Sequence, residues 1–164
     1  MEPKVYANRP QQTVSHSRAE QVHIITPADV NAGYTLFGGI LMQWIDIVAG
    51  VVARRHSGCD VRTAAVDHLD FIAPAYINDI VTIAGRVTFV GTTSMEVCVD
   101  TFVERMDSPA ERLHVNRAYL TMVAIGKDGK PTMVPELLCE TEAEHADYEM
   151  GAKRRALRKR HPVY

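Results

Sequence analysis

Hydrophobic residues recur every three to four positions along one central stretch, and this pattern predicts a long helix. From Leu36 onward the apolar positions keep a period of about 3.6 residues for about five turns, as in a helix that packs one face against a core. The positions are Leu36, Phe37, Ile40, Leu41, Trp44, Ile45, Val48, Val51 and Val52. The basic run Arg54-Arg55-His56 suits a helix C-terminus, and Ser57-Gly58 is expected to end the helix.

After Cys59 the pattern changes to alternation, which predicts β-strands. A first strand carries Val66 and Leu69 and runs to Phe71-Ile72-Ala73-Pro74. Three later strands are each expected to bury one face: Val81, Ile83, Val87 and Phe89; Met95, Val97, Val99 and Val103; Ala118, Leu120, Met122 and Ala124. We expect a polar loop around Asp107-Ser108-Pro109, and a hairpin at Lys127-Asp128-Gly129-Lys130 that returns through Thr132-Met133-Val134.

These elements predict one α+β domain in which a curved antiparallel sheet wraps a long central helix. Residues 1–18 lack any period and are expected to form a flexible N-terminal arm, residues 19–138 the domain, and residues 139–164 a charged helix or tail. A single sheet packed on a single helix leaves part of the sheet surface and its edge strands exposed to solvent. Pairing with a second copy is therefore expected.

Composition and charge exclude several classes of protein. A chain with 46% hydrophobic residues and a formal net charge of -2 is not disordered, and a pI of about 6.4 argues against a broad nucleic-acid-binding face. The segment richest in apolar residues, Leu36 to Ala53, contains the charged Asp46, so no membrane span is expected. The polar N-terminal residues do not form a secretory signal, and the three cysteines do not form a disulfide framework, so we expect a cytoplasmic protein.

Asp46 interrupts the apolar pattern of the predicted helix, which makes it a candidate for chemistry. The residues one or two turns away on either side are mostly small: Gly39, Met42, Gln43, Ala49, Gly50 and Ala53. A ligand or another backbone can approach such a face closely. Because a buried carboxylate is costly unless it is hydrogen-bonded or used, Asp46 is either a general base or nucleophile activated by burial, or a structural aspartate bonded to a facing backbone.

Gly38-Gly39 stands at the start of the same helix, where free backbone N–H groups favour developing negative charge. The pair is a candidate oxyanion hole, or an ordinary close-packing site. Asn31 lies in the preceding loop. Its amide can polarise a carbonyl or orient water, or it can simply form a turn.

The segment Glu140–Arg160 runs from acidic to basic, which is the polarity that a helix dipole prefers. It is either a solvated terminal helix, or its basic end, with Arg154, Arg155 and Arg158, holds the phosphates of an anionic ligand.

Other constellations are weaker. The residues His56, Cys59, His68 and Asp70 lack the spacing of a metal site, so no metal is expected. Ser94 has no nucleophile elbow around it, and a hydroxyl contact to a ligand or a turn cap suits it better.

Four motifs in the same order resemble the acyl-CoA thioesterases of the hotdog fold, over roughly Val22 to Pro135. The first is Asn31-Ala32-Gly33-Tyr34-Thr35-Leu36-Phe37-Gly38-Gly39, continued by Met42, Trp44 and Asp46. The others are Thr63-Ala64-Ala65-Val66-Asp67 with Phe71 and Pro74, Gly91-Thr92-Thr93-Ser94-Met95-Glu96-Val97, and Thr121-Met122-Val123-Ala124-Ile125 with the segments Asp128–Pro131 and Val134-Pro135.

The resemblance implies hydrolysis of acyl-CoA to a free acid and CoA, by a homodimer that assembles into a hexamer as a trimer of dimers. It places Asp46 and Asn31 in one catalytic site across the dimer interface, with the Gly39 N–H as oxyanion donor. Asp46 either deprotonates water or attacks the thioester directly. We expect the substrate to contact Phe37, Gly38, Thr63, Ser94, Arg154, Arg155 and Arg158. Acyl-CoA is the only expected ligand, without cofactor or metal, because thiolate is a good leaving group.

The sequence departs from the family pattern at four positions. Tyr34 stands where glycine usually lies three residues after the asparagine, and Asn78 stands where glycine usually precedes the aspartate. Ala73 and Thr92 occupy positions that are basic in many members. The basic residues from Lys153 to Arg160 can compensate for these in CoA binding.

Two other functions are considered beside hydrolysis of acyl-CoA. One is an acyl-CoA-binding sensor without turnover, which the presence of both Asn31 and Asp46 disfavours. The other is an enoyl-CoA hydratase. A hydratase is expected to carry a catalytic histidine early in the helix, and Leu36–Arg55 contains none.

Overall fold

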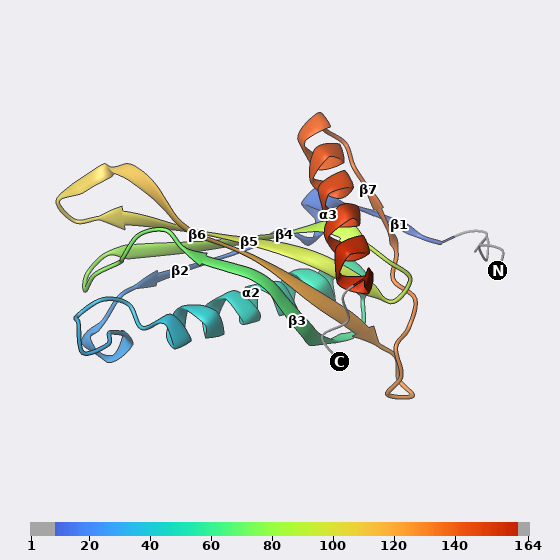
Figure 1. Cartoon of the computed structure of the whole chain (residues 1–164), viewed down its shortest axis with the longest axis horizontal. Coiled ribbons are helices and arrows are strands. Elements are labelled where there is room, and N and C mark those ends of the chain that lie inside the picture. Colours follow the sequence, from blue (N-terminus) through green and yellow to red (C-terminus); the bar gives the residue numbers. More distant parts are fainter. Residues whose placement is uncertain (1–8, 161–164) are drawn as a thin grey trace.

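The computed structural model describes residues 9–160 (Figure 1). Its helices are α1 Val14–Ser17, α2 Gly38–Ser57 and α3 Glu142–Arg160, with a short 3-10 helix at Pro27–Asp29. Its strands are β1 Gln11–Thr13, β2 Ala19–Ile24, β3 Asp60–Phe71, β4 Ile80–Val90, β5 Ser94–Arg105, β6 Ser108–Ile125 and β7 Glu136–Leu138.

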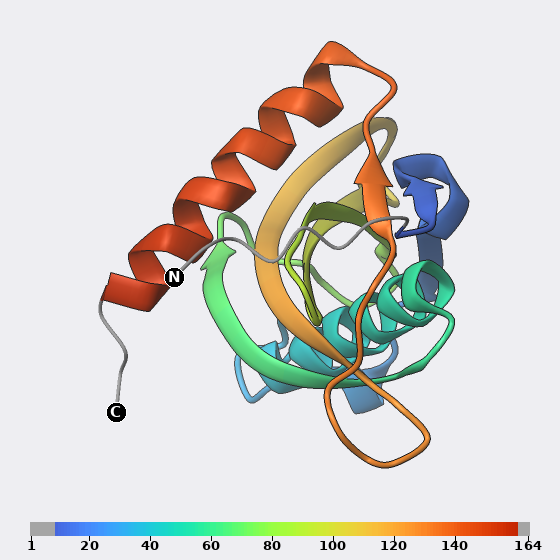
Figure 2. The ribbon, with the colours of Figure 1, turned by 90° about the vertical axis from the view of Figure 1, so that its right-hand side faces the viewer.

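Five of the strands form one antiparallel sheet in the order β2-β4-β5-β6-β3. The sheet curves around α2, and α3 lies on the opposite, outer face of the sheet (Figure 2). Helix and sheet approach closely at Gly85 of β4, where a Cβ atom would lie 2.8 Å from the Val48 side chain. The predicted α+β architecture, a long helix wrapped by a curved antiparallel sheet, is confirmed.

Helix α2 ends where the sequence predicts but begins two residues later than the apolar pattern. Gly58 closes it in the left-handed conformation with φ 66°, and its N–H bonds to the Arg54 carbonyl at 2.8 Å. Phe37 is the N-cap residue and is exposed, as is Val51. These two residues belong to the predicted apolar stripe, yet they face away from the core.

One predicted strand face carries Val81, Ile83, Val87 and Phe89. The prediction is wrong for Phe89. The register between β4 and β5 shifts between Val87 and Phe89, so the pairing partner of Phe89 is Glu96. A bulge adds one residue and reverses the alternation beyond it. Phe89 therefore points to the outer face, where its ring lies 4.9 Å from that of Tyr148 in α3.

Two predicted loops differ in detail. The polar loop around Asp107-Ser108-Pro109 is a tight turn at Met106-Asp107, because β6 already begins at Ser108. The turn at Asp128-Gly129 forms, with Gly129 at φ 75°. Its return is not a regular strand, although the bridge between Ile125 and Pro131 joins the two sides of the turn. Backbone hydrogen bonds from Gly126 to Lys130 and from Thr132 to Ala124 also join them.

The part of the predicted flexible arm that the structure describes is ordered against the domain. Strand β1 pairs in parallel with β7, Val14 is buried, and the Arg9 guanidinium donates to the Gly91 carbonyl at 3.0 Å. Residues 1–8 of the arm and 161–164 of the tail lie outside the described residues. The predicted charged terminal helix is α3.

Candidate active site

Asp46 lies on the face of α2 that points away from the core, and one partner fixes its side chain. The Thr63 hydroxyl, on β3, donates to Oδ1 of Asp46 at 2.5 Å. Among the described residues, Oδ2 of Asp46 has no hydrogen-bond partner. Because Asp46 is exposed within one chain, the burial that was expected to activate it is not provided by this chain alone.

Strand β3 positions Thr63 through two irregularities. The register with β6 shifts between Thr63 and Ala65 and again between Val66 and His68, so every third residue of this part of β3 pairs with every second residue of β6. The pairs are Thr63 with Met122, Val66 with Leu120, and Leu69 with Ala118. The bulges thus turn Thr63, Val66 and Leu69 toward α2, where regular alternation would have separated them.

Beside Asp46 lies a small apolar cavity of about 150 Å³ between α2, β3 and β6. Its lining residues are Met42, Ile45, Asp46, Val66, Leu69 and Leu120. Met42 and Val66 are 45% and 44% exposed, whereas Ile45 and Leu120 are buried. The cavity is therefore open at a rim formed by Met42 and Val66 and closed at Ile45 and Leu120.

The start of α2 offers backbone donors. The first helical hydrogen bonds come from the N–H groups of Ile40 and Leu41 to the Phe37 carbonyl, so the N–H groups of Gly38 and Gly39 have no partner within the helix. A Cβ atom at Gly39 would lie 2.7 Å from the Phe37 ring. A larger residue at position 39 would therefore require the exposed Phe37 ring to move.

Asn31 organises the loop before α2. Its Oδ1 accepts from the N–H groups of Gly33 at 2.9 Å and Thr35 at 3.3 Å, and its Nδ2 donates to the Thr35 hydroxyl at 3.0 Å. Tyr34, in the place of the expected glycine, takes the left-handed conformation with φ 59°. Asn78, the other such position, does the same with φ 70°. The turn role considered for Asn31 is present.

The basic tail belongs to α3, which lies on the opposite face of the sheet from α2 (Figure 2). Arg154 donates to both carboxylate oxygens of buried Glu96, at 2.7 and 3.0 Å, and Arg158 binds Asp67 at a bulge of β3. The Arg155 guanidinium lies 5.5 Å from the centre of the Phe89 ring. Two of the three tail arginines thus have carboxylate partners within the chain, and their contact with CoA phosphates stays a prediction.

Ser94 and Gly38 lie apart from the carboxylate. Ser94 is the first residue of β5, and its carbonyl accepts from the Gly91 N–H at 2.7 Å, which closes the β4–β5 turn. A Cβ atom at Gly38 would lie 3.4 Å from the Phe71 ring. The substrate contacts predicted for both residues stay predictions.

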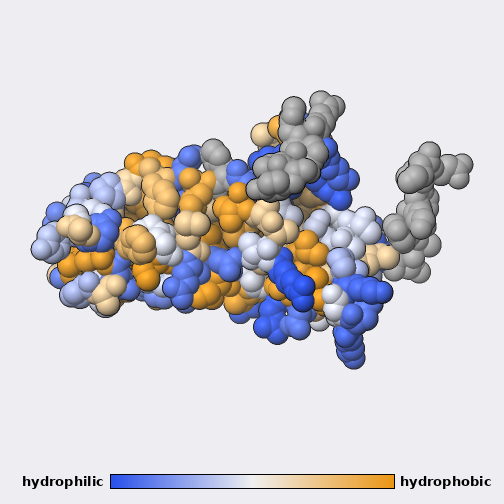
Figure 3. Space-filling view, turned by 60° about the horizontal axis from the view of Figure 1, so that its bottom comes forward, coloured by the Kyte–Doolittle hydropathy of each residue, from blue (hydrophilic) through white to orange (hydrophobic). Residues whose placement is uncertain are grey.

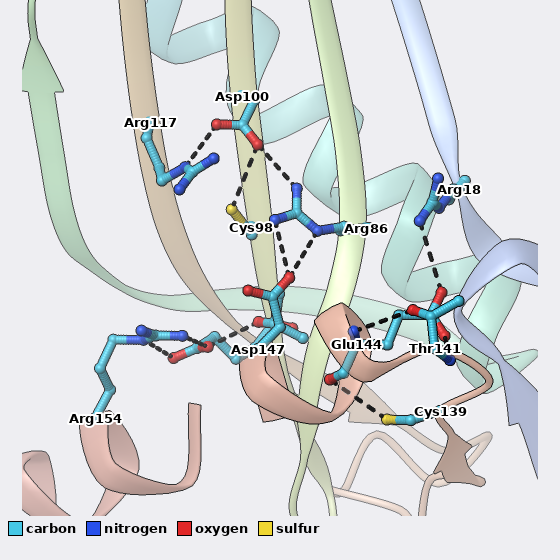
Figure 4. A network of polar contacts seen from close by, with 12 residues as sticks. Arg18, Arg86, Cys98, Asp100, Arg117, Cys139, Thr141, Glu144, Asp147 and Arg154 are labelled. Carbon is cyan, nitrogen blue, oxygen red and sulfur yellow. Dashed lines mark hydrogen bonds and ion pairs between the residues drawn. The ribbon is translucent and has the colours of Figure 1, made fainter. Parts of the chain in front are cut away.

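The outer face of the sheet carries a second polar cluster, which the sequence analysis missed (Figure 4). Asp100 of β5 accepts from Arg117 at 2.6 Å and from Arg86 at 2.8 Å, and Arg86 also pairs with Asp147 of α3 at 2.9 Å. Burial favours a raised pKa for Asp100, but the hydrogen bonds from the two arginines outweigh it and hold the pKa below its usual range. This cluster attaches α3 to the sheet.

Apolar side chains are exposed on the face of the molecule that carries α2 (Figure 3). The members of this apolar patch at the N-cap of α2, on α2 and on β3 are Phe37, Met42, Ile47, Val51, Val66 and Phe71, each between 37% and 55% exposed. Large apolar patches on soluble domains commonly mark a contact surface.

Within residues 9–160, no group of three or more His, Cys, Asp or Glu side chains could hold a metal ion. In the same part of the chain, no helix is long and apolar enough to cross a membrane.

Comparison with known proteins identifies similar chains. The model of the thioesterase superfamily matches residues 33–110. The cytosolic acyl coenzyme A thioester hydrolase of Rattus norvegicus is 36% identical over 87% of this chain, which spans 38% of that relative's length. An uncharacterized acyl-CoA thioester hydrolase of Bacillus subtilis is 39% identical over 88% of this chain and 86% of its own length.

Solved structures that resemble this chain include acyl-CoA hydrolases and thioesterases. An acyl-CoA hydrolase of Staphylococcus aureus in complex with coenzyme A, in a variant with one asparagine replaced by alanine, has a TM-score of 0.89 at 33% identity and covers 95% of this chain and 93% of its own. Alanine variants of the same enzyme at one aspartate and one threonine have also been solved. A hexameric acyl-CoA thioesterase has a TM-score of 0.87 at 36% identity and covers 92% of this chain and 96% of its own.

Proposed function

Because the chain belongs to the acyl-CoA thioester hydrolases of the thioesterase superfamily, we propose that it hydrolyses acyl-CoA to a free carboxylic acid and coenzyme A. One observation carries this proposal: an exposed carboxylate, Asp46, is fixed by Thr63 on a face of α2 that is otherwise mostly small or apolar. The name of the rat relative supports a cytosolic location.

The spacing of three residues supports their joint role. The asparagine, aspartate and threonine replaced in the Staphylococcus aureus hydrolase follow one another at intervals of fifteen and seventeen residues. Asn31, Asp46 and Thr63 have the same two intervals. We therefore assign these three residues to the proposed site.

Each carboxylate oxygen of Asp46 has its own task in the proposed reaction. Oδ1 accepts the hydrogen bond of Thr63, which fixes the orientation of the carboxylate. Oδ2 then either takes a proton from a water molecule that attacks the thioester carbonyl, or attacks that carbonyl itself to give an anhydride. In both routes the CoA thiolate leaves. A single turnover in ¹⁸O-labelled water distinguishes them, because hydrolysis of an anhydride at its aspartyl carbonyl leaves the label in Asp46.

The oxyanion donors and the carboxylate of one chain are too far apart to act on one carbonyl. Gly39 and Asp46 are seven residues apart on α2, which places them on the same helix face but about 10 Å apart along the axis. A two-fold axis near Met42 and Gln43, with the two α2 helices antiparallel, brings Gly39 of one chain opposite Asp46 of the other. We propose that each site is shared in this way between two chains.

The surroundings of Asp46 support such a dimer. The exposed apolar patch on α2 and β3 is centred on this stretch of helix, and a second copy would cover it. Cover by a partner would also remove Asp46 from water. The hexameric assembly of one relative supports a trimer of such dimers.

The test is release of CoA thiol from acyl-CoA by the parent and by Asp46→Asn, which keeps the shape of the side chain and removes the base. We expect turnover by the parent and a loss of most of it in the variant, with unchanged folding. Turnover of the variant within about tenfold of the parent would show that Asp46 is not the main base. Binding of acyl-CoA by the parent without thiol release would favour a sensor, and hydration of enoyl-CoA without hydrolysis would favour a hydratase.

A further inference from the structure

The cavity beside Asp46 has the shape and chemistry of a pocket for one short apolar chain. It opens at a rim of Met42 and Val66 and ends against Ile45 and Leu120, which are 2% and 1% exposed. Apart from Asp46, every lining residue is aliphatic or Met. An apolar lining of this kind favours apolar ligands.

The bulges of β3 create this pocket. Val66 and Leu69 are three residues apart, and in a regular strand they would point to opposite faces. The register shift between Val66 and His68 turns both toward α2, opposite Leu120 and Ala118 of β6. Both side chains consequently line the cavity. Bulges recur next to active sites, where they redirect side chains in this way.

We propose that this cavity receives the acyl chain of the substrate and that Leu120, at its closed end, limits the preferred chain to about six carbons. The limit follows from volume, because an apolar cavity of about 150 Å³ holds an occupant with about six carbons, such as benzene. The inference rests on the proposed function, since it places the thioester carbonyl at Asp46 and the acyl chain behind it.

A larger cavity of about 280 Å³ lies at the start of α2, lined by Leu36, Leu41, Phe71 and Val115 among others. Asp46 does not line it. A chain bound there would be unaffected by the size of residue 120. Substitution of Leu120 therefore shows which of the two cavities binds the acyl chain.

Chain length is the measured variable. Each methylene that enters the cavity should raise kcat/KM by about fourfold, and the gain should stop once the cavity is full. For acetyl-, butyryl-, hexanoyl-, octanoyl-, decanoyl- and palmitoyl-CoA, we therefore expect kcat/KM to rise to hexanoyl-CoA and then to level off or fall. A steady rise through palmitoyl-CoA would overturn the limit.

Leu120→Ala lengthens the cavity and should raise the ratio of kcat/KM for octanoyl-CoA to that for hexanoyl-CoA by about tenfold. The matched control is Leu113→Ala, on the same strand but not part of the cavity lining, which should keep the parent's profile. Because Leu120 is buried and its truncation can unfold the protein, Val66→Phe at the exposed rim gives a second test. It should move the optimum toward butyryl-CoA.

The outcomes separate this inference from the proposed function. Thiol release with an unchanged chain-length profile in both Leu120→Ala and Val66→Phe would overturn the acyl cavity and leave the hydrolase standing. Thiol release from none of the esters by the parent would overturn the hydrolase and with it the cavity's assignment.

Discussion

The hydroxyl of Thr63 lies 2.5 Å from Oδ1 of Asp46, so a strand holds the carboxylate that a helix presents. A bulge in β3 directly after Thr63 is part of the reason that its side chain points to α2. The orientation of Asp46 therefore depends on an irregularity of the sheet edge as well as on the helix.

Replacement of Thr63 by valine should lower kcat, because it removes the hydroxyl that orients Asp46 and keeps the shape of the side chain. Hydrogen bonds to charged groups contribute about 1.5–3 kcal/mol, which corresponds to about ten- to a hundredfold in rate. Thr63→Ser retains the hydroxyl and should retain most of the activity. Thiol-release kinetics measure both variants.

Thr121→Val is the control for the Thr63 variants, because this hydroxyl on β6 donates to Asp67 and not to Asp46. Its kcat should stay near that of the parent. Equal activity of Thr63→Val and the parent would show that the hydrogen bond to Asp46 does not contribute to turnover.

The pair of Glu96 and Arg154 should govern stability rather than chemistry. Glu96 is 1% exposed, so Arg154→Met would leave its buried carboxylate without its main partner and should lower the free energy of unfolding by about 3 kcal/mol. Adding Glu96→Gln to Arg154→Met should restore part of that loss. Urea unfolding at a fixed protein concentration measures it.

Arg155→Met is the matched control for Arg154, since its guanidinium stacks on Phe89 and has no carboxylate partner among the described residues. It should change stability by less than Arg154→Met does. Equal losses in the two variants would contradict a specific contribution of the pair of Glu96 and Arg154 to stability.

His56 should make the protein less stable as the pH falls from 7 toward 5. Burial lowers the pKa of His56 below its usual 6.5, although its contact with the Pro135 carbonyl at 3.2 Å partly opposes the shift. The unfolded chain then takes up a proton near pH 6.5 that the folded protein does not bind, so stability is lost as the pH drops through this range. His56→Gln keeps an N–H donor and should flatten the dependence. An identical slope in this variant would contradict the account.

Much of the framework could be predicted from the sequence because it follows local periodicity. The 3.6-residue period gives α2, Gly58 marks its end, and alternation gives the buried face of β6 at Ala118, Leu120, Met122 and Ala124. The charge polarity of Glu140–Arg160 gives α3.

The remainder depends on irregularities and on contacts between distant segments. The alternation of apolar and polar residues gives no sign of the bulges in β3 or of the bulge before Phe89. The shared orientation of Thr63, Val66 and Leu69, which depends on the bulges in β3, could therefore not be predicted. The pairing of Glu96 with Arg154 joins segments 58 residues apart. A weak signal for it existed, since Glu96 alternates with the apolar face of β5 and so faces α3.

The most direct test of the shared site uses Asn31→Ala and Asp46→Ala, each inactive alone, co-expressed in one cell. If Asn31 of one chain acts with Asp46 of the partner subunit, random pairing gives about half heterodimers, each with one intact and one doubly damaged site, so about a quarter of all sites recover. Mass analysis must first confirm the heterodimers. Given those, thiol release near a quarter of the parent's is the result that the account predicts, and activity no higher than that of the two inactive parents would contradict it.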